Sequence, residues 1–334
     1  MNTFGRLFRV SIFGESHGHS TGVVLDGVPA GISLDAADFE KDLERRRSGT
    51  KGTTPRKEPD SPVLASGVLN GLTTGSPLTV IFENRDVRSA GYEKFRDVPR
   101  PGHADFTATK KWSGYNDIRG AGHLSGRLTN GLVAAGVLAK KIIAPVNVTS
   151  SLVEAGGEND ISKAVDKASD LNDSIGGVVE CRARNLPVGL GEPFFDSVES
   201  VISHIIFSIP AIRGIEFGAG FASARMKGSE HNDRIISDEG KTETNNAGGV
   251  NGGITNGNEL FFRVAAKPTS SIALTQRTID LKKGREVELK SEGRHDLCIA
   301  LRIPVITEAA AAIALADLFL IHRGIQGNIL SAKD

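Results

Sequence analysis

The fold is decided first by residues 6–28, which read RLFRVSIFGESHGHSTGVVLDGV. β-Branched and aromatic side chains fill both ends of this stretch, and such residues favour pleated strands. We therefore predict strands over residues 6–13 and 21–28, joined by the loop 14–18 (GESHG). Glycines on both sides of His17 leave its imidazole free to face a ligand, and a histidine can give or take a proton near neutral pH.

Further elements follow from residue spacing outside this stretch. Helices are expected where apolar residues recur every three to four positions between caps and glycine or proline stops. These expected helices cover residues 35–47, 104–112, 124–142, 196–209 and 307–322. Strands are expected where β-branched residues cluster, over residues 62–69, 77–82, 177–183, 215–225, 259–266 and 287–290. Helices and strands interleave without internal repeats, so we predict one domain over residues 1–334.

One long polar segment interrupts this pattern at residues 227–258, which are rich in glycine and asparagine. Loops of this length are uncommon in compact domains and usually serve a function. We predict a mobile loop within the single domain.

The composition argues against several classes of protein. The chain holds 40 Lys and Arg and 40 Asp and Glu, so it lacks the global positive field that attracts nucleic acid, and any anion site must be built locally. Cys181 and Cys298 lack metal-type spacing, which argues against a zinc site and a disulfide framework. Arg6 and Arg9 interrupt the apolar N-terminus, so we expect a cytoplasmic protein without a signal peptide or membrane anchor.

A second histidine lies in a rigid turn. The sequence RPGH at 100–103 cannot form a regular element, so His103 is presented just where a helix begins. Rigid loops position catalytic groups well. A purely structural role, in which this imidazole caps the following helix, stays open.

Basic residues are dense from Arg45 to Lys57, with RRR at 45–47. Guanidinium groups bind phosphate and carboxylate bidentately, so this cluster suggests an anion clamp. Two alternatives stay open. One is a solvated helix end that complements the helix dipole, and the other is a nucleic-acid-binding patch.

The loop 14–18 also matches the G-x-S-x-G motif of serine hydrolases, with Ser16 as the nucleophile. That motif requires a helix directly after the serine, but a strand is expected over 21–28. A hydrolase therefore stays an alternative. His17 and His19 have no acidic or cysteine partner at metal-binding spacing, so no metal is expected.

Three further segments carry groups suited to a phosphorylated ligand. GAGHLS at 120–125 opens the expected helix 124–142, and free backbone N–H groups at a helix start bind phosphate. KPTSS at 267–271 offers an ammonium group and hydroxyls after a strand. RHD at 294–296 lies in an apolar stretch, where burial would perturb its titration. A plain helix cap and a plain turn remain alternatives for the first two segments.

Together these segments resemble the chorismate synthase family nearly end to end. Three separated signatures carry the resemblance: residues 14–29 with GESHG and DGVP, residues 100–105 (RPGHAD), and residues 294–309 from RHD to TEA. Additional matches are RRR at 45–47, NAGG at 246–249 and KPTSS at 267–271.

The resemblance implies an α+β fold in which helices pack between two antiparallel sheets, assembled as a homotetramer. It implies a carbon–oxygen lyase of the shikimate pathway of aromatic amino acid biosynthesis. This enzyme makes chorismate by anti 1,4-elimination of phosphate from 5-enolpyruvylshikimate 3-phosphate. The family uses reduced FMN without net redox change, with NADPH as a candidate reductant. No nucleic-acid or membrane partner is implied.

The resemblance also implies roles for individual residues. His17 would protonate the leaving phosphate, His103 would be the acid that tunes the reduced flavin, and Asp296 would assist proton removal. Substrate contacts are implied for Arg46, Arg100, Arg127 and Arg294. FMN contacts are implied for His123, Leu124, Ser125, Pro210, Ala211, Gly252, Lys267, Pro268, Thr269, Ser270, Ser271 and Arg294. NADP contacts are implied for Arg46 and Lys51.

This chain departs from the family pattern in three places. His123 and Leu124 stand where an arginine and an alanine are usual, and Leu128 stands where a glutamate is usual. The segment after Gly49 is shortened, which leaves Lys51 in place of a second arginine.

Overall fold

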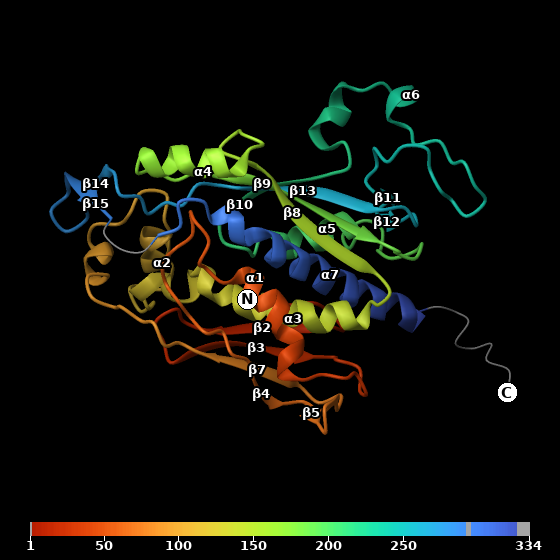
Figure 1. The fold of residues 1–334 in the computed structure, drawn as a ribbon, viewed down its shortest axis with the longest axis horizontal. Coiled ribbons are helices and arrows are strands. Elements are labelled where there is room, and N and C mark those ends of the chain that lie inside the picture. The colour runs from red at the N-terminus through yellow and green to blue at the C-terminus, as the bar shows by residue number, and fades with distance from the viewer. Residues whose placement is uncertain (1, 292–294, 326–334) are drawn as a thin grey trace.

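Two antiparallel sheets enclose a layer of helices in the computed structural model, which describes residues 2–291 and 295–325 (Figure 1). The first sheet holds, in spatial order, β1 (Thr3–Phe4), β2 (Arg9–Gly14), β3 (Ser20–Asp26), β7 (Leu78–Glu83) and β4 (Val63–Ser66). The second holds β10 (Ile212–Phe217), β13 (Leu260–Ala266), β9 (Gly177–Arg184) and β8 (Asn147–Ala155). This architecture confirms the expected α+β sandwich.

Register decides which face of the first sheet meets the helices. Val23 pairs with Val80 and Leu25 pairs with Leu78 across β3 and β7. All four side chains are fully buried, so the two strands present one continuous apolar row. Burying each such side chain stabilises the fold by about 1.5–3 kcal/mol.

The middle layer contains α1 (Glu40–Arg46), α3 (Thr129–Ile142), α5 (Val198–Ile206) and α7 (Ile303–Ile325). α3 lies against β3, α7 lies against β8 and β9, and the two helices pack on each other. The absence of a side chain at Gly136 allows their close approach. A Cβ added there would lie only 2.4 Å from the Cβ of Ala309. A larger side chain at either position would force the helices apart.

The segment Ile299–Ile325, formed by η6 (Ile299–Arg302) and α7, is long and apolar enough to span a membrane. Its most apolar window is 83% buried inside the molecule. In this structure the segment is therefore the central core helix of the sandwich.

Shorter elements surround the sandwich. Three hairpins pair β5 (Val68–Leu69) with β6 (Leu72–Thr73), β11 (Val250–Asn251) with β12 (Ile254–Thr255), and β14 (Thr275–Asp280) with β15 (Arg285–Lys290). The remaining α-helices are α2 (Asp105–Lys111), α4 (Ile161–Asp170) and α6 (Gly228–His231). The remaining 3-10 turns are η1 (Ala36–Phe39), η2 (Glu93–Arg96), η3 (Arg119–Leu124), η4 (Gly126–Leu128) and η5 (Gly220–Arg225).

Two predicted elements are wrong in part. The helix expected over 124–142 begins as an α-helix only at Thr129, because residues 120–122 have positive φ and Ser125 caps the short turn η4 instead. The strand expected over 215–225 ends at Phe217, because Gly218 and Gly220 also adopt positive φ and the chain turns into η5.

The 227–258 segment contains little regular structure, as expected, but its arms are tied together. The Asp233 carboxylate accepts the hydroxyl of Thr244 at 2.6 Å and the backbone N–H groups of Asn246 and Ala247 at 2.8 and 2.9 Å. The mobility of the segment stays a prediction.

Candidate active site

One cavity of about 1430 Å³ collects most of the predicted site residues. Its lining includes His17, Arg46, Arg100, His103, His123, Leu124, Ser125, Arg127, Pro210, Ala211, Lys267, Pro268, Thr269, Ser270, Ser271 and Asp296. Pockets for one small ligand usually measure about 300–1,000 Å³. The cavity is therefore larger than the usual site for one small ligand.

The loop between β2 and β3 places His17 in the cavity wall. Its side chain is largely buried, its Nδ1 lies 3.1 Å from Oγ of Ser89, and its ring meets Tyr92 edge to face at 5.2 Å. A Cβ added to Gly120 would lie 2.6 Å from Nε2 of His17. The backbone at Gly120 therefore packs directly against the imidazole, and any side chain at this position would displace the ring.

His103 is held by a buried carboxylate at the start of α2. Its Nδ1 lies 2.7 Å from Oδ1 of Asp105. Arg100 donates Nη2 to the same Oδ1 and Nε to Oδ2, each at 2.8 Å. Burial of Asp105 alone would raise its pKa, but the hydrogen bonds from Arg100 and His103 hold that pKa well below its usual range. An ionised carboxylate on Nδ1 leaves Nε2 as the nitrogen that can exchange a proton with a ligand.

The three consecutive arginines at 45–47 diverge. Arg46 is 2% exposed, lines the cavity and pairs with Asp60. Arg45 instead donates Nη1 and Nη2 to Glu308 of α7 at 2.8 and 2.6 Å. The expected anion clamp is therefore wrong for Arg45, because a buried helix carboxylate already holds its guanidinium.

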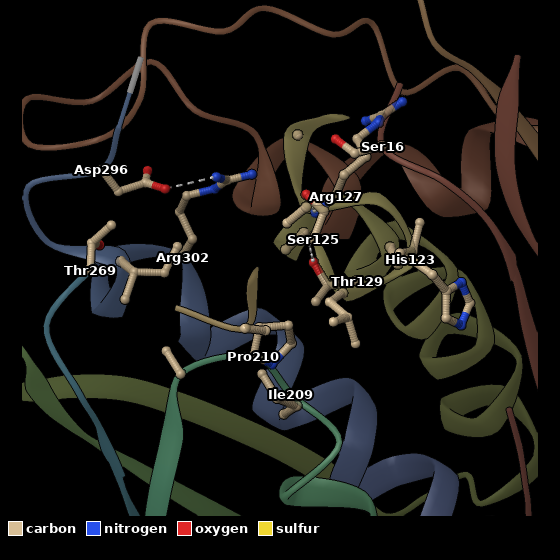
Figure 2. Close-up of a pocket in the computed structure, with 18 of the residues that line it drawn as sticks. Ser16, His123, Ser125, Arg127, Thr129, Ile209, Pro210, Thr269, Asp296 and Arg302 are labelled. Carbon is tan, nitrogen blue, oxygen red and sulfur yellow. Dashed lines mark hydrogen bonds and ion pairs between the residues drawn. The ribbon is translucent and has the colours of Figure 1, made fainter. Parts of the chain in front are cut away.

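Asp296 lies on one side of the cavity, opposite Arg127 (Figure 2). Its Oδ1 accepts the backbone N–H of Thr54 at 2.9 Å, and its Oδ2 lies 3.5 Å from Nη1 of Arg302. Arg302 in turn donates Nε to the carbonyl of Arg46 at 2.9 Å. Arg302 therefore links this carboxylate to the end of α1.

The segment 120–125 does not form the helix start that its glycines suggested. Positive φ at Gly120, Ala121 and Gly122 makes it a kinked turn, and His123 Nδ1 lies 2.8 Å from the carbonyl oxygen of Gly14. The turn therefore backs the loop that carries His17, and the prediction of a phosphate-binding helix terminus is wrong here.

The segment 267–271 closes another wall of the cavity. The Oγ of Ser270 donates to the carbonyl of Gly102 at 2.6 Å and lies 2.6 Å from Nζ of Lys267. Nη1 of Arg100 donates to Oγ of Ser271 at 3.0 Å. Burial and the nearby Arg213 lower the pKa of Lys267. These contacts join the segment to the turn that carries His103.

Two predicted site residues, Lys51 and Gly252, are not among those lining the cavity. Lys51 is exposed and pairs with Asp166 of α4, and Gly252 lies in the turn between β11 and β12. Arg294 lies outside the described residues. Their ligand contacts stay predictions.

The surroundings of Ser16 do not suit a hydrolase nucleophile. Ser16 is fully buried, and its Oγ accepts Nη1 of Arg56 at 2.9 Å. The element that follows is the strand β3, as expected, and not a helix. The basic residues from Arg45 to Lys57 likewise form no single exposed patch, since Arg46 and Arg56 line the cavity and Arg45 pairs with Glu308.

Sequence reasoning missed several residues that organise the cavity. Asp60 and Arg302 both line it, and Asp105 supports it from behind. Arg56, which also lines it, was expected only as part of the basic run from Arg45 to Lys57. Asp105 carried a signal as well, because it lies two residues after His103. Asp60 lies in irregular chain and Arg302 lies just before α7, where residue spacing does not predict which way a side chain points. The described residues contain no cluster of His, Cys, Asp or Glu arranged for a metal ion.

Comparison with known proteins gives one consistent family. A profile described as chorismate synthase matches residues 8–320. A chorismate synthase from Chitinophaga pinensis is 61% identical over 324 residues, covering 97% of this chain and 98% of that protein. A chorismate synthase from Thermococcus kodakarensis is 43% identical over 352 residues, covering 97% of this chain and 99% of that protein.

A solved structure shows the same fold. It is described as a crystal structure of chorismate synthase and superposes with a TM-score of 0.75 at 26% sequence identity. The match covers 98% of this chain and 95% of that one, so it extends over the whole sandwich and the cavity within it.

Proposed function

Because this chain belongs to the chorismate synthase family, a family of shikimate-pathway lyases, we propose how its cavity carries out the reaction. The proposed reaction is the anti 1,4-elimination of phosphate from 5-enolpyruvylshikimate 3-phosphate to give chorismate. It requires reduced FMN but no net redox change. The observation that carries the proposal is the meeting of His17, His103, Asp296 and buried arginines in one cavity.

The arginines suit the charge of the substrate. One phosphate and two carboxylates enter the site, and Arg46, Arg100 and Arg127 each have a guanidinium at the cavity wall. Charge-assisted hydrogen bonds to such groups are roughly twice as strong as neutral ones. We propose that these three, with Arg294, bind the substrate and stabilise the departing phosphate.

His17 is proposed as the acid for the leaving phosphate. Its imidazole lies in the cavity wall, with Ser89 at Nδ1 and Tyr92 edge to face with the ring. A phosphate oxygen bound against this ring would take the imidazole proton as the carbon–oxygen bond breaks. General acids of this kind accelerate reactions by about 10²–10⁴-fold.

His103 and Asp296 are proposed to act at the flavin. Bound FMN would supply electron density to the substrate as phosphate departs. Asp105 holds His103 so that Nε2 can donate to the reduced ring. Asp296, oriented by Thr54 and Arg302, would assist removal of the substrate proton.

The residues present fit an FMN site. The cavity volume exceeds that needed for the substrate alone, and its walls offer hydroxyls, an ammonium group and backbone amides. We propose FMN contacts from His123, Leu124, Ser125, Pro210, Ala211 and residues 267–271, with Gly252 and Arg294 as further contacts. One ring nitrogen of His123 already has a partner in the protein, because its Nδ1 binds the Gly14 carbonyl.

NADPH is proposed as a reductant of the flavin, with Arg46 and Lys51 as its contacts. Arg46 lines the cavity, whereas Lys51 lies on the surface beside Asp166. NADPH oxidation by the purified protein with FMN tests this point. A protein that turns over only with flavin reduced elsewhere would contradict it.

We also propose a cytoplasmic homotetramer without nucleic-acid or membrane partners. The highly exposed side chains of Phe194, Phe195 and Phe221 are apolar area that association would bury. Light scattering of the purified protein should give four times the mass of one chain, and a monomer would contradict the proposal.

FMN dependence tests the proposal as a whole. The protein should quench FMN fluorescence on binding, and substrate should turn over with reduced FMN but not with oxidised FMN under anaerobic conditions. Equal turnover with either form would contradict the proposed role of the cofactor.

A further inference from the structure

We propose that Asp60 is a positioning residue that sets Arg46 and Arg127 for the anionic groups of the substrate, an inference that rests on the function proposed above. Asp60 is 1% exposed and lies at the cavity wall. One oxygen accepts Nη2 of Arg46 and the other accepts Nη1 of Arg127. A single carboxylate thus joins guanidinium groups that come from α1 and from η4.

Arg127 is fixed on three sides and still has donors to spare. Its Nε donates to Oδ1 of Asn84 at 2.9 Å, and its Nη2 donates to the carbonyl of Glu83 at 3.4 Å. A guanidinium carries five N–H groups, so the hydrogen bonds to Asn84, Glu83 and Asp60 leave one N–H on each terminal nitrogen, with Oε2 of Glu58 4.0 Å from Nη2. Two such groups can bind one phosphate or carboxylate together.

Arg46 is also held by neighbouring side chains, and not all of its hydrogen-bond donors have partners. Its Nη1 donates to Oγ1 of Thr129 at 3.4 Å and its Nη2 to Asp60, while its buried Nε has no hydrogen-bond partner among the described residues. An unpaired buried donor is costly, and a ligand anion in the cavity would satisfy it.

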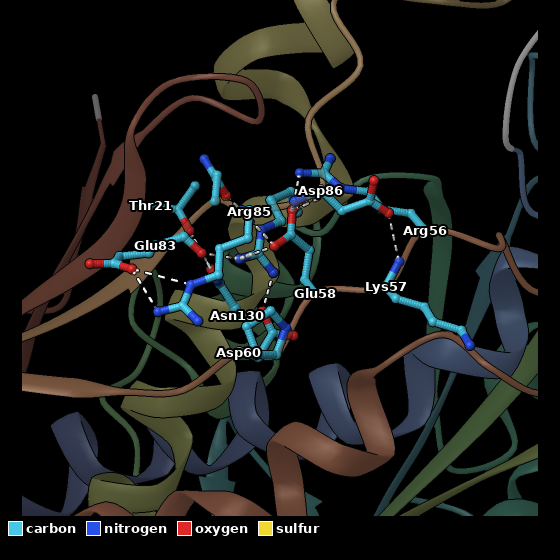
Figure 3. Close-up of polar contacts among 12 residues, drawn as sticks. Thr21, Arg56, Lys57, Glu58, Asp60, Glu83, Arg85, Asp86 and Asn130 are labelled. Atoms are coloured by element: carbon cyan, nitrogen blue, oxygen red, sulfur yellow. Dashed lines mark hydrogen bonds and ion pairs between the residues drawn. The ribbon is translucent and has the colours of Figure 1, made fainter.

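The segment around Asp60 is built rigidly. Asp60 adopts a φ of +48°, a left-handed conformation that aspartate, asparagine and glycine tolerate better than other residues. Figure 3 shows Asp60 and Glu58 in one network of polar contacts with Arg56. Glu58 accepts Nη2 of Arg56 at 2.7 Å and the backbone N–H groups of Arg85 and Asp86 at 2.9 and 3.2 Å.

Electrostatic repulsion explains why the positions of the Arg46 and Arg127 guanidinium groups depend on Asp60. Arg46 and Arg127 are both buried, and like charges at close range repel strongly in a low-dielectric interior. Burial alone would raise the pKa of Asp60, but Arg46 and Arg127 lower it, so the carboxylate stays ionised between them. Without it the two guanidinium groups would separate, and the spacing of their free N–H groups would change.

The test uses two substitutions that suit the backbone of Asp60. Asp60→Asn keeps the shape but turns an amide N–H₂ toward one guanidinium. Asp60→Gly leaves a space that formate could fill. The matched control is Asp42→Asn, because Asp42 also lies between two cations, Arg45 and Lys140, but outside the cavity lining.

Binding of 5-enolpyruvylshikimate 3-phosphate is measured by calorimetry, and kcat and KM are measured with reduced FMN. Asp60→Asn should weaken substrate binding and lower kcat/KM by about 10²-fold, since a 1 Å misplacement in a site can cost that much. FMN affinity should stay at the wild-type value. Formate should restore part of the activity of Asp60→Gly and none of that of Asp60→Asn.

Wild-type substrate affinity and kcat/KM in Asp60→Asn would overturn the inference, and so would an equal loss in Asp42→Asn. If Asp60→Asn fails to fold, Asp60→Gly decides: no recovery with formate, in a folded protein that binds FMN, would also overturn it. If the wild type binds the substrate but makes no chorismate, the proposed function is contradicted. The inference about Asp60 is then tested by the substrate affinities of wild type and Asp60→Asn alone.

Discussion

Nδ1 of His103 lies 2.7 Å from Oδ1 of Asp105, a carboxylate that is 2% exposed and also holds Arg100. This contact sets the orientation of the imidazole and decides which of its nitrogens can serve a ligand. We expect Asp105→Asn to lower kcat by about 10²-fold or more, because the amide no longer stabilises the imidazole in the required form. Anaerobic chorismate formation measures the loss, and an unchanged kcat would mean that His103 needs no partner.

The same carboxylate predicts how stability depends on pH. The pKa of Asp105 is lowered in the folded state, so its stabilising contribution is complete above its unfolded value of about 4 and is lost as pH falls below that value. The unfolding free energy should drop more steeply with acid in the wild type than in Asp105→Asn. Asp238→Asn, at an exposed position, is the control and should follow the wild-type curve. Parallel curves for Asp105→Asn and wild type would contradict this prediction.

Gly120 packs against the imidazole of His17. Gly120→Ala would place a methyl group 2.6 Å from Nε2, so we expect turnover to fall by about 10²-fold, comparable to losing the acid. Positive φ alone should not unfold the variant, because the neighbouring Ala121 already adopts a φ of +67°. Gly71→Ala, where φ is also positive at +76° and an added Cβ meets nothing within 4 Å, is the matched control. Full activity in Gly120→Ala would mean that turnover does not depend on the position of the His17 ring.

Neighbouring arginines should behave differently. Arg46→Lys should lower kcat/KM by about 10²-fold, because a lysine cannot reproduce the bidentate geometry of a guanidinium. Arg45→Lys should instead lower the free energy of unfolding by about 1–2 kcal/mol through its contact with Glu308, with kcat per folded molecule unchanged. Urea denaturation and steady-state kinetics separate the two effects. A matching loss of activity in both variants would contradict the division of this arginine run.

The two histidines are expected to fail in distinct ways. His17→Ala and His103→Ala should each slow turnover by about 10²–10⁴-fold while FMN still binds. Only the rate of His17→Ala should depend on the basicity of the leaving group, because His17 is proposed to protonate the departing phosphate. Unchanged rates in both variants would make these histidines structural.

Local patterns in the sequence predicted much of the fold. Strands β2 and β3 and helices α1, α5 and α7 all lie within or close to their expected ranges, because their apolar periodicity matches a buried face. The strand β8 escaped prediction, since the consecutive polar residues Thr149, Ser150 and Ser151 interrupt its apolar pattern. The kink at 120–122 escaped as well, because glycines before an apolar run read equally as a helix start.

The site was predicted less completely, for a physical reason. His17 and His103 were expected from their motifs and Asp296 from the family resemblance, and the structure brings them to one cavity. Asp60 was not expected, because its importance lies in two arginines that are 14 and 67 residues away in sequence. Contacts of that kind depend on tertiary packing, which residue spacing alone does not encode.

The most direct test of the account follows both products of the reaction. Purified protein is mixed anaerobically with reduced FMN and 5-enolpyruvylshikimate 3-phosphate, and chorismate and inorganic phosphate are measured together. The account predicts equal amounts of both products, none without flavin, and no consumption of the reduced flavin. A folded protein that binds FMN but releases phosphate without chorismate, or forms neither product, would contradict it.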